Sequence, residues 1–290
     1  MANYRGIYIN LDRSTARRDA MQAQLHKFGL VPVYTRLAAI DGSRIARQPG
    51  SAITPAEEGA FRSHAEAIRQ GASLSAPVHV LEDDALLSSA MQPVISEAVA
   101  TGLLDRFDIL FTDSFVAPDL GMLKVLIYAF EKCSARKTDG VALGDLQLFD
   151  ISRQNFSCLT SYIVAPKAFT RVIALLDAEL KSSPRLPVDL YLRQCAQAGK
   201  ITAGLLAPFV TGFNLDEVRQ STIAAGAEAA KRSVLVLAIL RYIFFLERDL
   251  AAAGACLESA LAGVARTPDD QTRLVLKALE FILSNEFREF

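Results

Sequence analysis

The residues best suited to chemistry in this sequence are three consecutive carboxylates, Glu82, Asp83 and Asp84. They follow the short apolar run at 78–81, which predicts a buried strand. Three like charges repel one another, and a divalent cation or a charged partner would neutralise them. Ligands of open α/β sheets bind beyond the carboxyl ends of strands, which is where the triplet lies. The triplet therefore indicates a cation site, although Asp83 and Asp84 would also favour the N-terminus of a helix predicted after Ser88.

Further polar candidates lie in the loops of the first strand, helix, strand unit. Residues 4–10 and about 31–37 read as strands with a helix between them. Asn10 and Asp12 follow the first strand, and Asp41 follows the second. We expect these three side chains to gather on one side of the sheet, because the carboxyl ends of successive strands in such a unit meet there.

Two more candidates lie on predicted helices. His64 is in a helix that begins with the capping box Thr54-Pro55-Ala56-Glu57, at the edge of its apolar stripe, where packing is a simpler interpretation than ligand binding. Asp189 opens a later helix in Pro187-Val188-Asp189, where an N-cap role would account for it.

Composition excludes several classes of protein. The net charge of −1, with 22% charged and 51% hydrophobic residues over 290 positions, does not suggest a nucleic-acid binder or a disordered chain. Four dispersed cysteines and three histidines argue against a structural zinc site and fit reduced thiols in the cytoplasm. The N-terminus has no signal-peptide core, and the apolar run 234–246 is too short to cross a membrane and contains Arg241. We expect a cytoplasmic protein.

The chain divides into two parts by composition. Strands alternate with helices up to about residue 222, after which alanine, leucine and glutamate dominate. We therefore expect an α/β domain at 1–223 and an all-α C-terminal module at 224–290.

Six segments, in order, resemble the family 25 glycosyltransferases, which include lipooligosaccharide and collagen galactosyltransferases. They are IYINLDRSTARR, AAIDG, ITPAEEGAFRSH, HVLEDDALL, TSYIVAPKAF and LPVDLYL. The likeness spans about residues 4–223. It implies a GT-A type fold, with a Rossmann-like mixed sheet flanked by helices, a UDP-sugar donor such as UDP-galactose, Mn²⁺ or Mg²⁺, and inversion at the anomeric carbon. Arg62 departs from the family pattern, because it lies in a stretch that is usually apolar. The sequence also has no histidine after His79, so a later histidine cannot complete the metal shell.

The resemblance also implies roles for the candidate residues. Glu82 and Asp84 would hold the metal, and Asp189 would be the base that takes the acceptor hydroxyl's proton. The remaining candidates would bind the donor: Asn10, Asp12, Arg13, Asp41, His64 and Asp83. Arg17 could offer charge to phosphate, and a solvated helix face explains Arg17 and Arg18 equally well.

The predicted function is metal-dependent transfer of galactose or another hexose to a glycan or glycolipid acceptor in cell-surface lipooligosaccharide biosynthesis. The alternatives are a catalytically silent, glycosyltransferase-like binding or assembly protein and, third, a nucleotidyltransferase. The apolar stretch 234–246 predicts a homodimer through the C-terminal helices, with peripheral membrane association as the competing use of that surface. In the dimer, Arg241 would pair with Glu247 or Asp249 of the partner subunit, or reach the rim.

Overall fold

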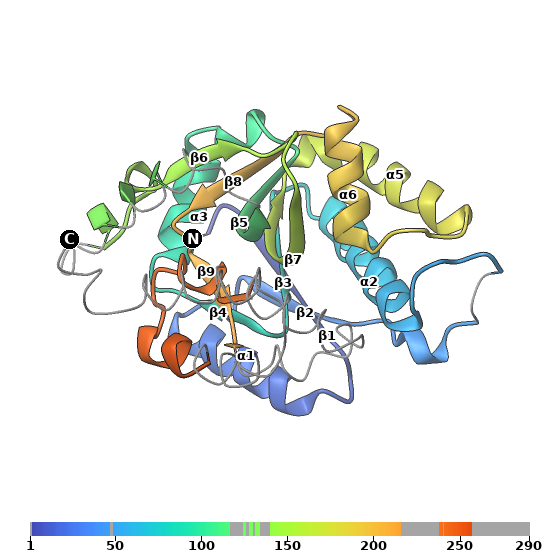
Figure 1. Ribbon diagram of the computed structural model, residues 1–290, viewed down its shortest axis with the longest axis horizontal. Coiled ribbons are helices and arrows are strands. Elements are labelled where there is room, and N and C mark those ends of the chain that lie inside the picture. The colour runs from blue at the N-terminus through green and yellow to red at the C-terminus, as the bar shows by residue number, and fades with distance from the viewer. Residues whose placement is uncertain are drawn as a thin grey trace, which may run out of the picture.

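The computed structural model describes residues 2–46, 49–116, 124–125, 128–129, 131–133, 140–215, 238–239 and 241–256. Within these ranges the chain forms a mixed sheet of seven strands flanked by helices, as the sequence predicted. The strands are β1 Arg5–Asn10, β2 Tyr34–Ala38, β3 Val78–Glu82, β4 Ala85–Leu87, β5 Ile109–Val116, β6 Gln147–Asp150, β7 Phe156–Val164, β8 Ala203–Ala207 and β9 Thr211–Phe213. The α-helices are α1 Thr15–Lys27, α2 Pro55–Ala72, α3 Met91–Ala100, α5 Phe169–Lys181 and α6 Val188–Gln197. Figure 1 shows α2, α5 and α6 grouped on one side of the sheet, with α1 and α3 on the other.

The order of the strands places the carboxyl ends of three of them together. The main sheet runs β2-β1-β3-β7-β5-β8-β6, and β4 pairs with β9 in a separate ribbon. β1 is parallel to both β2 and β3, whereas β7 is antiparallel to β3 and β5. Ile9 lies opposite Glu82, and Asn10 lies opposite Ala38. The loops after β1, β2 and β3 therefore emerge at one edge of the sheet, where the candidate residues were expected.

The hydrogen bonds at the start of α2 confirm the capping box that the sequence predicted. The Thr54 hydroxyl accepts from the backbone N–H of Glu57 at 3.2 Å, and the Glu57 carboxylate accepts from Thr54 N–H at 2.7 Å. This is the predicted capping box, which satisfies two N–H groups that the first helical turn leaves without partners. α1 ends before Gly29, whose φ of +67° is left-handed backbone that glycine adopts without strain.

Two details of the structure bear on the candidate acids. The helix predicted after Ser88 is α3, which begins at Met91, and β4 lies between it and the acidic triplet. The helix dipole therefore does not explain Asp83 and Asp84, since its influence falls off within the first turn. β5 extends from Ile109 to Val116, so Asp113 lies inside the strand.

A buried row of polar side chains crosses the first strands. Gly6 of β1 lies opposite Tyr34 on one side and His79 on the other. A Cβ at Gly6 would lie 2.2 Å from the Tyr34 ring, so the glycine lets that ring reach His79. Tyr34 Oη lies 2.5 Å from His79 Nδ1, and His79 Nε2 lies 2.8 Å from Ser161 Oγ. Burial lowers the pKa of His79 to about 3, so the ring is neutral.

Part of the C-terminal region packs against the main domain. Phe209 N–H donates to Phe244 C=O at 2.7 Å, and Leu246 N–H donates to Phe209 C=O at 3.0 Å. Ile239, Tyr242 and Phe245 are buried. The predicted boundary near 222–226 and most of the predicted helical module lie outside the described residues, as do residues 234–237 and 240 of the predicted dimer surface. Among the residues described, no helix is both long enough and apolar enough to cross a membrane.

Candidate functional site

Glu82, the first acid of the triplet, is held at the end of β3 by two side chains. Its Oε1 lies 3.1 Å from His64 Nε2, and its Oε2 accepts from the Thr160 hydroxyl at 3.3 Å. His64 is itself buried, with Nδ1 2.9 Å from Tyr162 Oη. Burial would raise the pKa of Glu82, but His64, Arg241 and Thr160 together lower it, which favours a carboxylate. His64 therefore does more than pack, because it orients an acid of the triplet.

Asp83 turns toward the first loop and α1. Asn10 Nδ2 donates to Asp83 Oδ2 at 2.7 Å, and Arg17 Nη1 donates to Oδ1 at 3.2 Å. Burial raises the pKa of Asp83 against the opposing effect of these two partners. The solvated-face interpretation is thus wrong for Arg17, whose guanidinium contacts the triplet.

Asp84 is the acid that the protein leaves unsatisfied. Its Oδ1 is buried and has no hydrogen-bond partner among the residues that the structure describes. Burial, together with the negative charge of Glu82, raises the pKa of Asp84 to about 7. A buried carboxylate oxygen without a partner is costly, and a bound cation would remove that cost.

The donor set suits a divalent cation but does not complete its shell. Carboxylate oxygens are the ligands that Mg²⁺ and Mn²⁺ prefer. Among the described residues, no group of three or more His, Cys, Asp or Glu side chains is arranged to hold a metal ion. The unpartnered oxygen of Asp84 and the nearby Glu82 fit such an ion, with the other positions left for water and phosphate oxygens.

The loops after β1 and β2 are joined by arginines. Arg36 Nε donates to Asn10 Oδ1 at 3.0 Å, and its Nη2 donates to Asp12 Oδ1 at 2.5 Å. Arg13 forms an ion pair with Asp41. The hydrogen bond from Arg36, with its charge, lowers the pKa of Asp12. The structure therefore brings the predicted loop residues to one edge, and it adds Arg36, whose place in a strand gave no signal in the sequence.

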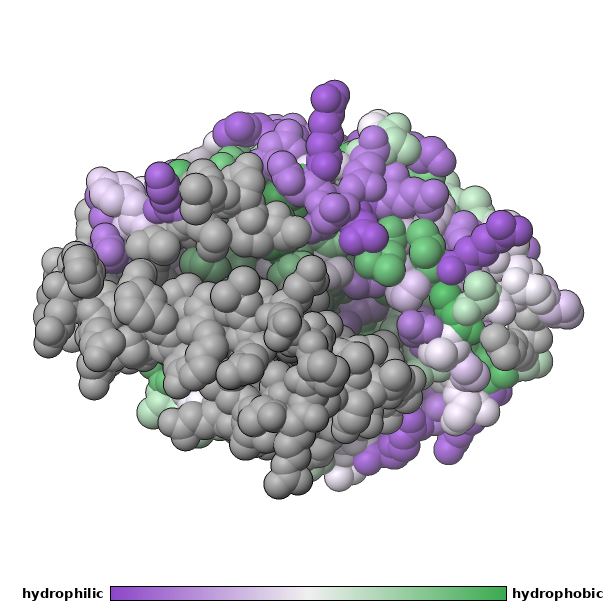
Figure 2. Space-filling model, viewed as in Figure 1, coloured by the Kyte–Doolittle hydropathy of each residue, from purple (hydrophilic) through white to green (hydrophobic). Residues whose placement is uncertain are grey.

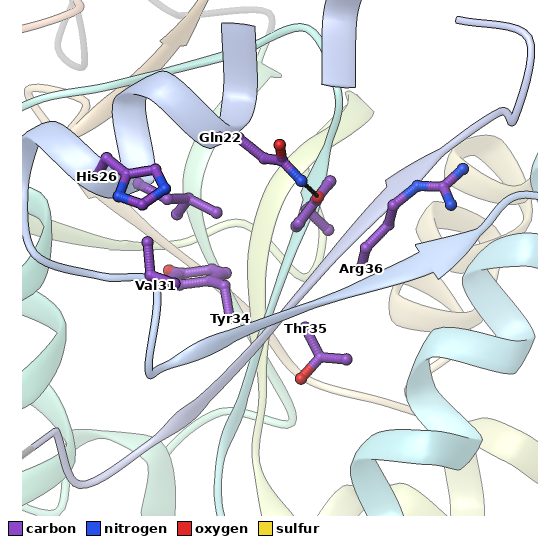
Figure 3. A pocket seen from close by; sticks show the side chains of 8 residues that line it. Gln22, His26, Val31, Tyr34, Thr35 and Arg36 are labelled. Atoms are coloured by element: carbon purple, nitrogen blue, oxygen red, sulfur yellow. Dashed lines mark hydrogen bonds between the residues drawn. The ribbon is translucent and has the colours of Figure 1, made fainter. Parts of the chain in front are cut away.

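A separate pocket borders this edge. It has a volume of about 380 Å³ and is lined by Tyr8, Gln22, Leu25, His26, Val31, Tyr34, Thr35 and Arg36. Figure 3 shows the Arg36 side chain extending away from His26 and Val31. Gln22 Nε2 donates to Tyr8 Oη at 3.4 Å. The acidic triplet does not line this pocket. Figure 2 shows that the face seen in Figure 1 is hollowed near its centre, with hydrophilic side chains along its upper part.

A buried ion pair joins Arg241 to Asp113 of β5. Arg241 Nε donates to Asp113 Oδ1 at 2.5 Å, and Nη2 donates to Oδ2. Although burial alone would lower the pKa of Arg241, the charge of Asp113 raises it, so the guanidinium stays charged. The predicted pairing of Arg241 with Glu247 or Asp249 of the partner subunit is wrong, because its partner is Asp113 of the same chain.

Asp189 anchors α6 to β7. Its Oδ2 accepts from the backbone N–H of Cys158 at 3.0 Å. Pro187 is the N-cap and Val188 the first helical residue, so the predicted N-cap role of Asp189 is wrong. Cys158 has a φ of +72°, an uncommon conformation for a residue with a side chain. The carboxylate therefore helps to hold an irregular point of the strand.

The Cys158 thiol shows that the acids share one neighbourhood. Burial raises its pKa to about 11; Arg241 opposes this rise, and the charges of Asp189, Asp113 and Glu82 add to it. Asp189, although distant from the triplet in sequence, thus lies within electrostatic reach of the same thiol as Glu82.

Arg62, the departure in α2, has a partner. It donates to Glu58 at 2.7 and 3.0 Å, one helical turn earlier. This pairing lets an arginine replace an apolar residue, because the buried Glu58 carboxylate and the guanidinium neutralise each other.

Comparison with known families gives one result for this site. A family model described as glycosyltransferase family 25 (LPS biosynthesis protein) matches residues 5–192. The matched span contains the triplet, the loop residues and Asp189, and it excludes Arg241. A comparison with curated proteins gives no match.

Proposed function

The chain belongs to glycosyltransferase family 25, a family of LPS biosynthesis, and we propose that it transfers a hexose from a UDP-sugar to a glycan or glycolipid acceptor. The observation that carries this proposal is the buried, unpartnered Oδ1 of Asp84 beside Glu82, at the carboxyl end of a central strand. An acid left unsatisfied in an otherwise paired site marks a place prepared for a ligand.

We propose that Glu82 and Asp84 hold Mn²⁺ or Mg²⁺. Such an ion would stabilise the negative charge that develops on the diphosphate leaving group. The chain's own contribution is orientation. His64 and Thr160 fix the two oxygens of Glu82, and His64 is fixed in turn by Tyr162. Partners of this kind set the direction of a ligand's lone pairs and strengthen binding.

The donor's nucleoside is proposed to bind at the loops after β1 and β2. Asn10 is fixed there from two sides, by Arg36 and by Asp83. Asp12 and Asp41 carry carboxylates whose pKa values are lowered, so they are charged acceptors for ribose hydroxyls at neutral pH. Arg13, paired with Asp41 and largely exposed, can turn toward phosphate.

Asp189 is proposed as the base for an inverting reaction. A base of this kind takes the proton of the acceptor hydroxyl as the oxygen attacks the face opposite the leaving group. The hydrogen bond from Cys158 N–H to Oδ2 holds the carboxylate in one orientation. Fixed orientation favours catalysis because the base need not be ordered at each turnover.

The decisive experiment is donor binding followed by donor hydrolysis. UDP with Mn²⁺ should raise the melting temperature of the purified protein, because a ligand that binds only the folded state stabilises it by mass action. A screen of nucleotide sugars for hydrolysis would then identify the donor. Binding without hydrolysis or transfer would instead indicate a catalytically silent binding protein, and tighter binding of nucleoside triphosphates than of UDP would indicate a nucleotidyltransferase.

A further inference from the structure

Arg241 reaches the acidic site from outside the span that matches the family, residues 5–192. Its side chain is only 8% exposed, and its guanidinium makes two hydrogen bonds to the fully buried Asp113. The guanidinium carbon also lies 4.3 Å from the centre of the Phe213 ring. A planar guanidinium group that is bound by a carboxylate and lies against an aromatic ring is held in one orientation.

Strand pairing places Asp113 close to Glu82. Asp113 in β5 lies opposite Ser161 in β7, and Ser161 lies opposite Leu81 in β3. Leu81 directly precedes Glu82. The two acids therefore lie at nearly the same level of the sheet, on strands separated by β7 alone, at a point where the register of β5 shifts.

Phe213 brings the same guanidinium close to Asp84. Phe213 in β9 lies opposite Ala85 in β4, and Ala85 directly follows Asp84. The next residue, Asn214, donates its N–H to the Asp84 carbonyl at 3.4 Å. The guanidinium of Arg241 thus lies between the strand that carries Asp113 and the ribbon that begins after the triplet.

The segment that carries this arginine is fixed to the domain at further points. Phe209 exchanges backbone hydrogen bonds with Phe244 and Leu246. The Glu247 carboxylate accepts from the N–H of Ser89 at 2.6 Å and from its hydroxyl at 2.7 Å. Figure 1 shows this segment, in orange, beside β4 and β9. Its contacts make it part of the wall of the site.

The charges in this neighbourhood are opposite to that of a dication. When all three acids are ionised, Glu82, Asp84 and Asp113 carry three negative charges and Arg241 carries one positive charge, which leaves a net charge of −2. The adjacent Asp83 is paired with Arg17.

We propose that Arg241 is a positioning residue of the donor site: a fixed cation, held by Asp113, that sets the charge met by the metal and by the donor's diphosphate. The inference rests on the proposed function. A fixed positive charge weakens the binding of a metal cation and strengthens the binding of an anion at the same site. If Arg241 only supported the fold, replacing it would change the affinities for Mn²⁺ and for UDP in the same direction.

The test compares three side chains at this position in an Asp113→Asn background. That background is needed because a lone buried carboxylate would take up a proton and hide the change in charge. The chains are Asp113→Asn alone, Asp113→Asn with Arg241→Lys, and Asp113→Asn with Arg241→Gln. Calorimetry would give the affinity for Mn²⁺ alone and, at saturating Mn²⁺, the affinity for UDP, with the melting temperature recorded for each chain.

The expected result has opposite signs for the two ligands. Relative to Asp113→Asn alone, adding Arg241→Gln should tighten Mn²⁺ binding and weaken UDP binding, each on the order of three- to tenfold. Adding Arg241→Lys, which keeps the charge and loses the planar fork, should leave both affinities within about twofold. Parallel changes of both affinities, or a lysine variant that behaves like the glutamine variant, would overturn the inference and leave the proposed function intact.

Two further outcomes are informative. If the Asp113→Asn background does not fold, Arg241→Lys in the parent chain serves instead, and a change of either affinity by more than about fivefold would overturn the inference. If the parent protein binds neither Mn²⁺ nor UDP, the proposed function fails, and this inference fails with it.

Discussion

Replacing Asp84 with asparagine should stabilise the protein while it abolishes metal-dependent donor binding. Asp84 Oδ1 is buried without a partner, and burial with the charge of Glu82 raises the pKa to about 7 from 3.8. The pKa is therefore higher in the folded chain than in the unfolded chain. For an acid, this means that the folded state loses stability as pH rises from about 4 to about 7.

The size of the effect follows from the shift. Three pKa units correspond to about 4 kcal/mol at full ionisation, and sharing the titration with Glu82 reduces this to about 2–4 kcal/mol. Without metal at pH 8, Asp84→Asn should exceed the parent in free energy of unfolding by about that amount. The difference should shrink toward zero below about pH 3, where Asp84 is protonated in both states.

Urea denaturation at several pH values measures this difference, and thermal shift with Mn²⁺ and UDP measures the loss of binding. Asp12→Asn is the matched control, because Asp12 is exposed and its pKa is lowered by Arg36, so its removal should not stabilise the protein at pH 8. An Asp84→Asn protein that is no more stable than the parent at pH 8, or that keeps its response to Mn²⁺ and UDP, would refute the assignment of Asp84 as the unsatisfied metal ligand.

Three other substitutions test the rest of the structure. Asp189→Asn keeps an oxygen for the backbone hydrogen bond, so UDP affinity should be unchanged while the transfer rate falls by a factor on the order of 10² to 10⁴; lost UDP binding would point to a purely structural role. Gly6→Ala should lower the free energy of unfolding by about 1–3 kcal/mol, because the new Cβ would lie 2.2 Å from the Tyr34 ring. Gly144→Ala is the control and should show little change, because no atom lies within 4 Å of the Cβ that it would add. His79 has a pKa of about 3 in the folded chain, so the unfolded chain takes up its proton first, and stability should fall as pH drops below about 6.5. Between pH 7.5 and 5.5 this amounts to about 1.4 kcal/mol, and His79→Gln should lack that part of the pH dependence; equal slopes for parent and variant would contradict a neutral, buried ring.

The sequence alone determined the features that depend on neighbours along the chain. The capping box at Thr54 follows from backbone chemistry within a few residues, and it is confirmed. The position of the acidic triplet at the end of a strand followed from an apolar run and its abrupt end. The order of six short segments was enough to predict the family, and a match over residues 5–192 confirms it.

Only the tertiary structure decided what each acid of the triplet contacts. Glu82, Asp83 and Asp84 are adjacent in sequence, yet the turn after β3 sends them to His64, to Asn10 and to a buried position without a partner. No periodic pattern encodes that divergence, because it depends on which strands and helices surround the turn.

The ion pair of Asp113 and Arg241 is the clearest case, since its members are 128 positions apart. The apolar residues around Arg241 predicted a burial surface, for which the sequence suggested a second subunit or a membrane, and it placed Arg241 beside an acid of the partner subunit or at the rim. The sheet order instead brings an acid of β5 within reach, and a buried guanidinium pairs with the carboxylate that the fold places beside it. Sequence patterns report local geometry and burial, whereas the pairing of distant charges is decided only when the strands are assembled.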